Sequence, residues 1–129
     1  MKFKEPKMIL EFFQLHPIVR YMSTHFELLS LEYFKIDPVV TRILEKVDGE
    51  SGVHQDKRAI DFRNESPKGA FLYTADQVKF LVSEMNKKFP GEDKYPSCIH
   101  HSFNGGNHHF HLQVTLGDKQ LAIGTKTIF

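Results

Sequence analysis

The chain has 129 residues, and its 17 Lys and Arg against 16 Asp and Glu give a formal net charge of +1. This length predicts one domain, residues 1–129, that can bury about two thirds of its unfolded surface. The near-neutral charge argues against a nucleic-acid partner held by a basic surface. Cys98 is the only cysteine, so no disulfide can form within the chain, and we expect Cys98 to pack as a small apolar side chain.

No targeting or membrane segment is expected at the start of the chain. The apolar run from Met8 to Leu15 is interrupted by Glu11 and Gln14, and no small-residue cleavage site follows. A membrane helix would need about 20 apolar residues. We therefore expect synthesis in the cytoplasm without a signal peptide and no membrane partner. A role at the cell wall would then require release by another factor.

The first 50 residues predict two helices. Pro6 can open the first, and Pro17 would stop or restart it. The segment 26–34 is rich in Leu and aromatic residues without a clear period, which favours simple core packing. Asp37 is a good N-cap and Pro38 suits the first turn of a second helix, which should end at Asp48-Gly49. Its apolar face would consist of Val40, Ile43, Leu44 and Val47.

A polar segment followed by a strand comes next. Ala59-Ile60-Asp61-Phe62-Arg63 alternates as a strand does, which puts Ala59, Asp61 and Arg63 on one face. A buried Asp is costly unless a cation or hydrogen bonds compensate it. His54 lies seven residues before Asp61, across a segment long enough to fold back over the strand. His54 and Asp61 are therefore a plausible pair of metal ligands.

The second half predicts a loop, a helix and a hairpin. Asn64 to Gly69 has the composition of a loop. Thr74 and Gln77 form a capping box for a helix that ends before Pro90. Residues 97–102 form a short strand, and the turn at residues 103–107 returns the chain as a second strand. The tail could add a last strand from Gln120 to Ile123. The expected fold is α+β, with a small antiparallel sheet that carries the metal ligands and is packed by helices on one side.

The returning strand carries the histidines that matter most. His109, His111 and Gln113 share one face, and Phe110, Leu112 and Val114 share the other. Two imidazoles two residues apart on one strand face can project into the same cleft. In the hairpin, His100 or His101 would lie beside this strand, where either is a candidate to orient a ligand.

These residues resemble the zinc peptidases of the D-alanyl-D-alanine carboxypeptidase and hedgehog-like group, which includes phage endolysins. The resemblance rests on His54 and Asp61 at the spacing His-x6-Asp, with Ala59 two residues before the Asp, and on the later run His109-Phe110-His111-Leu112-Gln113-Val114. It implies that His54, Asp61 and His111 bind Zn²⁺ and that His109 assists the water or the transition state. The implied substrate is a peptide of peptidoglycan.

The expected chemistry is hydrolysis of an amide bond in a peptidoglycan stem peptide or cross-link. Zinc with three protein ligands keeps a position for water, which is the expected nucleophile. Arg63 is the better candidate to hold a substrate carboxylate, because it shares the face of Asp61, and Arg58 is the second candidate.

Two other functions remain open. The motif of the resembled family usually has Ser, Gly and, in one branch, Glu where this chain has Gly52, Lys57 and His108. These departures are compatible with a cell-wall-binding module that keeps the metal cage without turnover. A metal-dependent nuclease that uses the His-rich hairpin is the third possibility, and the near-neutral charge weighs against it.

Overall fold

The computed structural model describes residues 1–45, 53–54, 56–91, 95–103 and 105–114. Its five-stranded sheet has the order β1-β2-β3-β5-β4. In chain order the elements are β1 (Lys2–Phe3), α1 (Lys7–Gln14), α2 (Pro17–Phe34), β2 (Val39–Arg42), β3 (Ala59–Arg63), α3 (Ala75–Lys88), β4 (Cys98–Phe103) and β5 (Gly106–Gln113). The α+β prediction is confirmed. No helix in the described ranges is long and apolar enough to cross a membrane.

The sheet is mixed, whereas the sequence predicted an antiparallel one. β1 pairs parallel with β2, and the other neighbours pair antiparallel. Parallel neighbours need a long crossover, and here α1 and α2 supply it. A strand of only two residues leaves no recognisable alternation in a sequence, so β1 could not be predicted.

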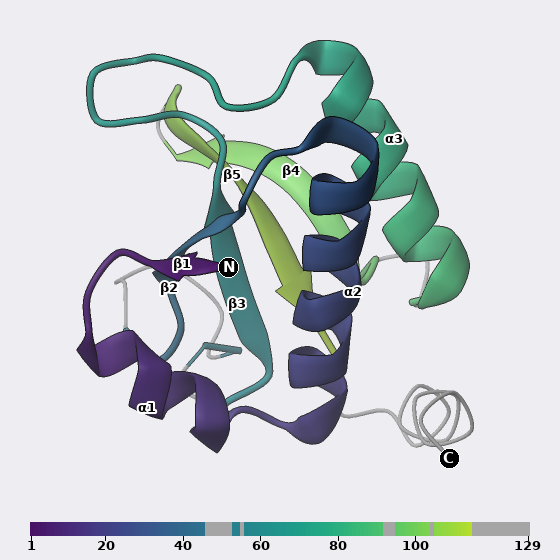
Figure 1. Cartoon of the computed structure of the whole chain (residues 1–129). Helices are drawn as coiled ribbons and strands as arrows, with labels where there is room; N and C mark the ends of the chain where they lie inside the picture. Colours follow the sequence, from purple (N-terminus) through teal and green to yellow (C-terminus); the bar gives the residue numbers. More distant parts are fainter. Residues whose placement is uncertain (46–52, 55, 92–94, 104, 115–129) are drawn as a thin grey trace.

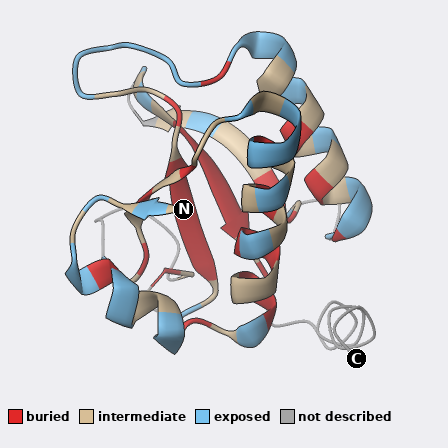
Figure 2. Ribbon diagram, in the orientation of Figure 1, coloured by how far each residue is buried: buried red, intermediate tan, exposed pale blue. Residues whose placement is uncertain are grey.

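One face of the sheet is covered by α2 and α3, which lie side by side against it (Figure 1). Phe26 of α2 stacks on Phe62 of β3 with ring centroids 4.6 Å apart, and it meets Phe110 of β5 edge-on at 5.0 Å. All three side chains are fully buried. Figure 2 shows that β3 and β5 are the most buried strands. The predicted alternation of both strands is confirmed, because their apolar faces form this core.

The helix predicted from Asp37 to Gly49 is wrong in its described part. Residues 39–42 form β2, the strand between β1 and β3, and residues 46–49 lie outside the described ranges. The β-branched residues Val39, Val40 and Thr41 favour a strand, and the sheet supplies the hydrogen-bond partners.

A β-bulge in β2 decides which way its side chains face. Val40 is paired with Phe62, whereas Arg42 is paired with Asp61, so two steps along β2 match one step along β3. A bulge of this kind changes the sheet face to which the following side chain points. Val40 therefore packs in the core, and Arg42 reaches the opposite face of the sheet, where Asp61 lies.

The remaining predicted elements are largely confirmed. Pro6 is the N-cap of α1, and α2 begins at Pro17. The capping box of Thr74 and Gln77 is present at the start of α3. Gly105, in the β4–β5 turn, has φ 79°, a left-handed conformation that favours glycine. Cys98 is buried. The strand predicted from Gln120 to Ile123 lies outside the described residues.

Candidate metal centre

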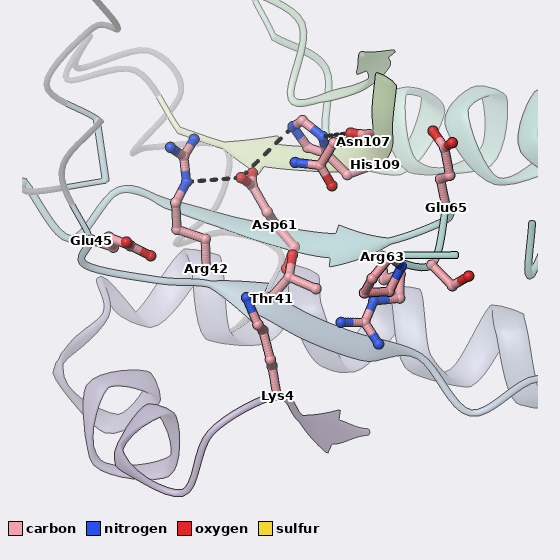
Figure 3. Close-up of a pocket in the computed structure, with 11 residues that line it drawn as sticks. Lys4, Thr41, Arg42, Glu45, Asp61, Arg63, Glu65, Asn107 and His109 are labelled. Atoms are coloured by element: carbon pink, nitrogen blue, oxygen red, sulfur yellow. Dashed lines mark hydrogen bonds and ion pairs between the residues drawn. The ribbon is translucent and has the colours of Figure 1, made fainter. Parts of the chain in front are cut away.

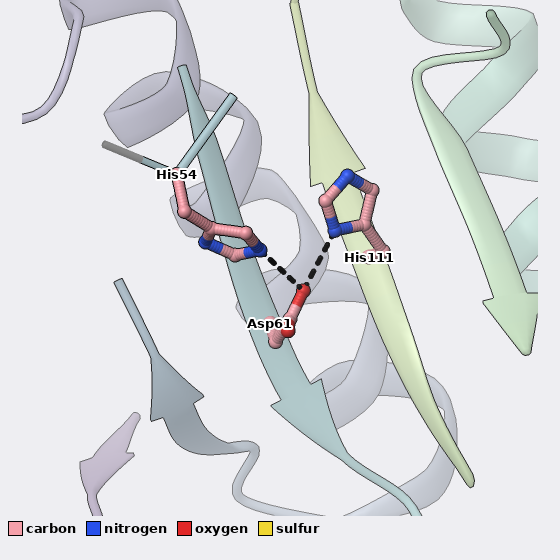
Figure 4. Close-up of side chains that lie close together, drawn as sticks. All are labelled: His54, Asp61 and His111. Atoms are coloured by element: carbon pink, nitrogen blue, oxygen red, sulfur yellow. Dashed lines mark hydrogen bonds and ion pairs between the residues drawn. The ribbon is translucent and has the colours of Figure 1, made fainter. Parts of the chain in front are cut away.

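Three side chains converge on the sheet face that α2 and α3 leave uncovered. Asp61 projects from β3, His111 from β5, and His54 from the turn that precedes β3 (Figure 4). His111 Nδ1 lies 2.7 Å from Asp61 Oδ1, and His54 Nε2 lies 3.3 Å from the same oxygen. All three residues are buried, and one ligand atom from each lies within 4.8 Å of the other two. This group can hold a metal ion.

The sheet register explains why Asp61 is at the centre of this group. Arg42 of β2 and His111 of β5 are its two cross-strand partners, so the three residues form one row across three strands. Side chains opposite each other on one sheet face are close enough to interact directly. The row places a cation on one side of the carboxylate and an imidazole on the other.

Hydrogen bonds fix the orientation of His54. Its Nδ1–H donates to the backbone carbonyl of Ile43 at 2.8 Å, so Nε2 is the ring nitrogen with the free lone pair. This Nε2 is buried and has no hydrogen-bond partner in the described part of the chain. A buried polar atom without a partner is costly. A cation bound beside Asp61 would remove that cost.

Neighbouring side chains at both carboxylate oxygens stabilise the negative charge of Asp61. Arg42 Nε donates to Asp61 Oδ2 at 3.0 Å, and the imidazoles lie at Oδ1. Burial alone would raise the pKa of Asp61, but the hydrogen bond with His111 and the nearby His54 lower it well below its usual range. Burial would likewise lower the pKa of His111, but its hydrogen bond with Asp61 raises it above the ordinary value. Asp61 is therefore a carboxylate, the form that binds a cation.

His109 lies next to this group and is directed toward it. Its Nδ1–H donates to the carbonyl of Asn107 at 2.7 Å, and its Nε2 lies 3.7 Å from Asp61 Oδ2 (Figure 3). That Nε2 is also buried and lacks a hydrogen-bond partner among the described residues. His101 of β4 is close by, with ring centroids 4.4 Å from His109 and 5.8 Å from His111.

A pocket of about 460 Å³ opens beside Asp61 and His109 (Figure 3). Arg63 and Lys4 add positive charge to its wall, and within the described part of the chain neither has a carboxylate partner within salt-bridge distance. Arg63 is the cross-strand neighbour of His109. The lining residues are Lys4, Thr41, Arg42, Glu45, Asp61, Arg63, Glu65, Ser66, Pro67, Asn107 and His109.

Two of the predicted site residues lie elsewhere. Arg58 pairs with Asp56 and donates to the carbonyl of Val114 at 2.9 Å, and it does not line the pocket. His100 contacts Phe110 on the helix-covered side of the sheet, and its Nε2 hydrogen-bonds to the side chain of Asn64. Of the two histidines predicted to orient a ligand, only His101 lies beside the group.

Sequence reasoning missed Arg42, because it placed this residue in a helix. The signal that could have found it is the run of β-branched residues before it, which indicates a strand that ends beside Asp61.

The backbone conformation of Lys57 is unusual for a residue with a side chain. Its φ of 62° is left-handed, which is the conformation that favours glycine.

Comparisons of the chain with protein-family models, with curated proteins and with solved structures find no match.

Proposed function

We propose that the protein is a zinc-dependent peptidase that hydrolyses an amide bond in a stem peptide or cross-link of peptidoglycan. The observation that carries the proposal is the convergence of His54, Asp61 and His111. The lone-pair nitrogens of His54 and His109 are buried there and have no hydrogen-bond partner among the described residues. Two imidazoles and one carboxylate form a ligand set that suits catalytic zinc. When bound, the cation supplies Lewis-acid chemistry, lowering the pKa of a coordinated water and polarising a carbonyl.

His109 is the proposed general base. Because its Nδ1–H donates to Asn107, its Nε2 can accept a proton from the attacking water. This Nε2 lies 3.7 Å from Asp61 Oδ2, so the base is directed at the proposed metal position. His108 occupies the position of the Glu in one branch of the resembled family. It hydrogen-bonds to Glu65 at 2.8 Å and has no contact with Asp61 among the described residues, which favours His109.

Arg63 is the proposed substrate-binding residue. Its guanidinium lines the pocket on the same face as Asp61, next to His109 along the sheet. A planar guanidinium pairs with a carboxylate through two hydrogen bonds. A peptide that places its scissile amide at the metal would thus offer its carboxylate to Arg63. Lys4 adds charge of the same sign to the pocket wall.

The family resemblance supplies the substrate class, and the backbone of Lys57 supports it. The usual motif has Gly at this position, and the left-handed φ of Lys57 is what such a Gly would provide. The backbone of Lys57 is thus compatible with the Gly of the motif, although the residue differs. The Lys57 N–H donates to the His54 carbonyl at 3.1 Å.

The test combines metal analysis with a lysis assay. Wild type should bind one zinc ion and clear a peptidoglycan suspension, and a chelator should abolish the clearing. His54→Ala should lose both zinc and clearing. His109→Ala should keep the zinc but lose most of the turnover, roughly 100-fold or more for a general base. His25→Ala, which changes a histidine packed on Phe89 outside the site, is the matched control and should behave like wild type.

The outcomes separate the candidate functions. Zinc binding with sedimentation on peptidoglycan but no clearing would favour the binding module. Hydrolysis of nucleic acid that depends on His54 would favour the nuclease. Unchanged clearing by His109→Ala would remove His109 from the mechanism.

A further inference from the structure

The pocket beside Asp61 carries two cations, and the proposed hydrolysis gives a role to only one of them. Arg63 is the proposed partner of a substrate carboxylate, and Lys4 lines the same pocket (Figure 3). Neither cation has a carboxylate within salt-bridge distance among the described residues. A ligand with a single carboxylate would therefore leave one of the two cations without an opposite charge.

The sheet register brings both cations to the face that the helices leave open. Phe3 of β1 pairs with Val40, and Val40 pairs with Phe62 of β3. All three of these residues pack in or against the core. Lys4 and Arg63 each follow one of them directly, so the alternation of side chains turns both to the other face. The Lys4 N–H donates to the Val40 carbonyl at 2.9 Å, which holds the chain in place there.

The carboxylates that line the pocket do not pair with these cations. Glu65 Oε1 accepts from the backbone N–H of His108 at 3.1 Å and from its Nδ1 at 2.8 Å. Figure 3 shows the Glu65 carboxylate directed away from the Arg63 guanidinium, with Glu45 at the opposite end of the pocket. Asp61 belongs to the metal group. The wall that holds Arg63 therefore keeps its positive charge.

Two neutral hydrogen-bond donors line the same pocket. Ser66 Oγ accepts from the backbone N–H groups of Lys68 at 3.3 Å and Ala70 at 3.1 Å, so its own proton remains to be donated. The side-chain amide of Asn107 has no hydrogen-bond partner in the part of the chain that the structure describes. The pocket thus offers cations and neutral donors to a ligand with several acceptor oxygens.

The two cations differ in the group that each can hold. A planar guanidinium pairs with one carboxylate through two parallel hydrogen bonds, whereas an ammonium group acts as a compact charge. A carboxylate that is paired with Arg63 in this way does not satisfy Lys4. The pocket volume of about 460 Å³ lies in the range of sites that hold a small ligand.

We propose that the Arg63 and Lys4 side of the pocket is a subsite for two carboxylates, so that the substrate residue held there is an acidic amino acid with both carboxylates free. This inference rests on the proposed function for the identity of its ligand as a substrate. The subsite itself belongs to the protein without metal, and its ligand preference can be measured without turnover.

The first measurement compares two ligands of equal length on metal-free protein. Glutarate has two carboxylates, and monomethyl glutarate has one. Zinc is removed with a chelator, which is then dialysed away, so that neither the cation nor the chelator competes for the ligands. Titration followed by ¹H–¹⁵N chemical shifts should show that glutarate binds roughly 3- to 5-fold more tightly, the contribution typical of one exposed ion pair.

Variants assign this preference to the two cations. Lys4→Met should abolish the preference for glutarate. Arg63→Met should weaken the binding of both ligands by roughly 10-fold or more, the effect of losing hydrogen bonds to a charged group. Lys79→Met is the matched control, because Lys79 is an exposed residue of α3 and its loss changes the net charge equally. It should keep the preference.

The second measurement uses zinc-loaded protein and two stem peptides that differ only in ending in Glu or in Gln. The KM for the Glu peptide should be lower by the same factor of roughly 3 to 5. Lys4→Met should abolish this difference between the two peptides.

The proposal is overturned if glutarate and monomethyl glutarate bind equally, or if Lys4→Met and Lys79→Met reduce the preference to the same extent. Inorganic phosphate that binds at least as tightly as glutarate would indicate a site for one compact dianion and would also overturn it. Should Arg63→Met not fold, Lys4→Met still decides, because Lys4 is exposed. A Lys4-dependent preference for glutarate in a protein that hydrolyses no peptide would support the subsite and contradict the peptidase. Hydrolysis of both peptides with equal KM would overturn the subsite and leave the peptidase in place.

Discussion

The Arg42–Asp61 pair leads to a prediction that couples stability to metal binding. Arg42→Met removes the guanidinium that donates to Asp61 Oδ2 at 3.0 Å while keeping an apolar side chain of similar length. The side chains are 12% and 5% exposed, so the carboxylate would remain buried without this partner. Loss of one partner of a buried ion pair is strongly destabilising.

The expected size follows from what stays beside Asp61. Breaking a buried pair costs about 3–5 kcal/mol, and the lower end applies because His111 and His54 still lie at 2.7 and 3.3 Å. An unfolding entropy of about 0.27 kcal/mol/K is expected for a chain of this length. A loss of ~3 kcal/mol in the unfolding free energy then lowers Tm by roughly 11 °C. These values hold for the metal-free protein.

Zinc should reduce this loss, because the cation compensates the same carboxylate. We expect the deficit of Arg42→Met, measured by urea denaturation with chelator and with saturating zinc, to shrink by at least about 1.5 kcal/mol, the size of one hydrogen bond to a charged group. Arg58→Met is the control. Arg58 is 15% exposed, but its partner Asp56 is 57% exposed and lies outside the metal group. A deficit of Arg42→Met that is equal or larger with zinc would refute the reasoning.

Three further measurements test local features of the fold. Lys57→Gly should raise the unfolding free energy by about 0.5–1 kcal/mol in urea denaturation, because the left-handed strain at φ 62° exceeds the entropy that glycine adds to the unfolded chain; a loss of stability would contradict this. Burial raises the pKa of Tyr73 to about 12 against the weaker opposing effect of its Ser30 hydrogen bond. The folded state therefore keeps a proton that the unfolded state loses above pH of about 10, so the unfolding free energy of wild type should fall toward pH of about 12. Tyr73→Phe lacks this titrating group and should not show its contribution to the fall. Burial also raises the pKa of the Cys98 thiol to about 12. A thiol reagent should therefore label Cys98 at least about 1000-fold more slowly in the native than in the denatured protein. Immediate labelling of the native protein would show that Cys98 is accessible.

The elements that the sequence predicted correctly carry local signals. The alternation around Asp61 and His111 has a period of two, and the Thr74 capping box and the glycine-containing turn before β5 are short-range patterns. Each follows from residues that are neighbours in the chain. The same alternation predicts that Asp61 and His111 lie on one face of the sheet. In the structure the predicted ligand group does converge there.

The failures have a different physical origin. Val40 and Ile43 are both buried, and their spacing of three residues imitated a helix, whereas a bulge in β2 produces it. The helix α2 has buried Met22 and Phe26 but exposed Leu28, and these apolar residues on several sides obscure its period. The pairing of β1 with β2 depends on a long-range contact. Neither the bulge nor the β1–β2 pairing can be deduced from residues close in sequence.

The core and the candidate centre depend on the same sheet register. Because side chains alternate, a slip of β3 by one residue would move Asp61 to the helix-covered face and Phe62 to the open one. The stacking of Phe26 on Phe62 therefore fixes the register that pairs Asp61 with His111. The bulge in β2 then adds Arg42 to the same row. A buried carboxylate surrounded by a guanidinium and imidazoles often gives no more stability than apolar packing would. Its place at the centre of the sheet is therefore better explained by the ability of this group to hold a cation.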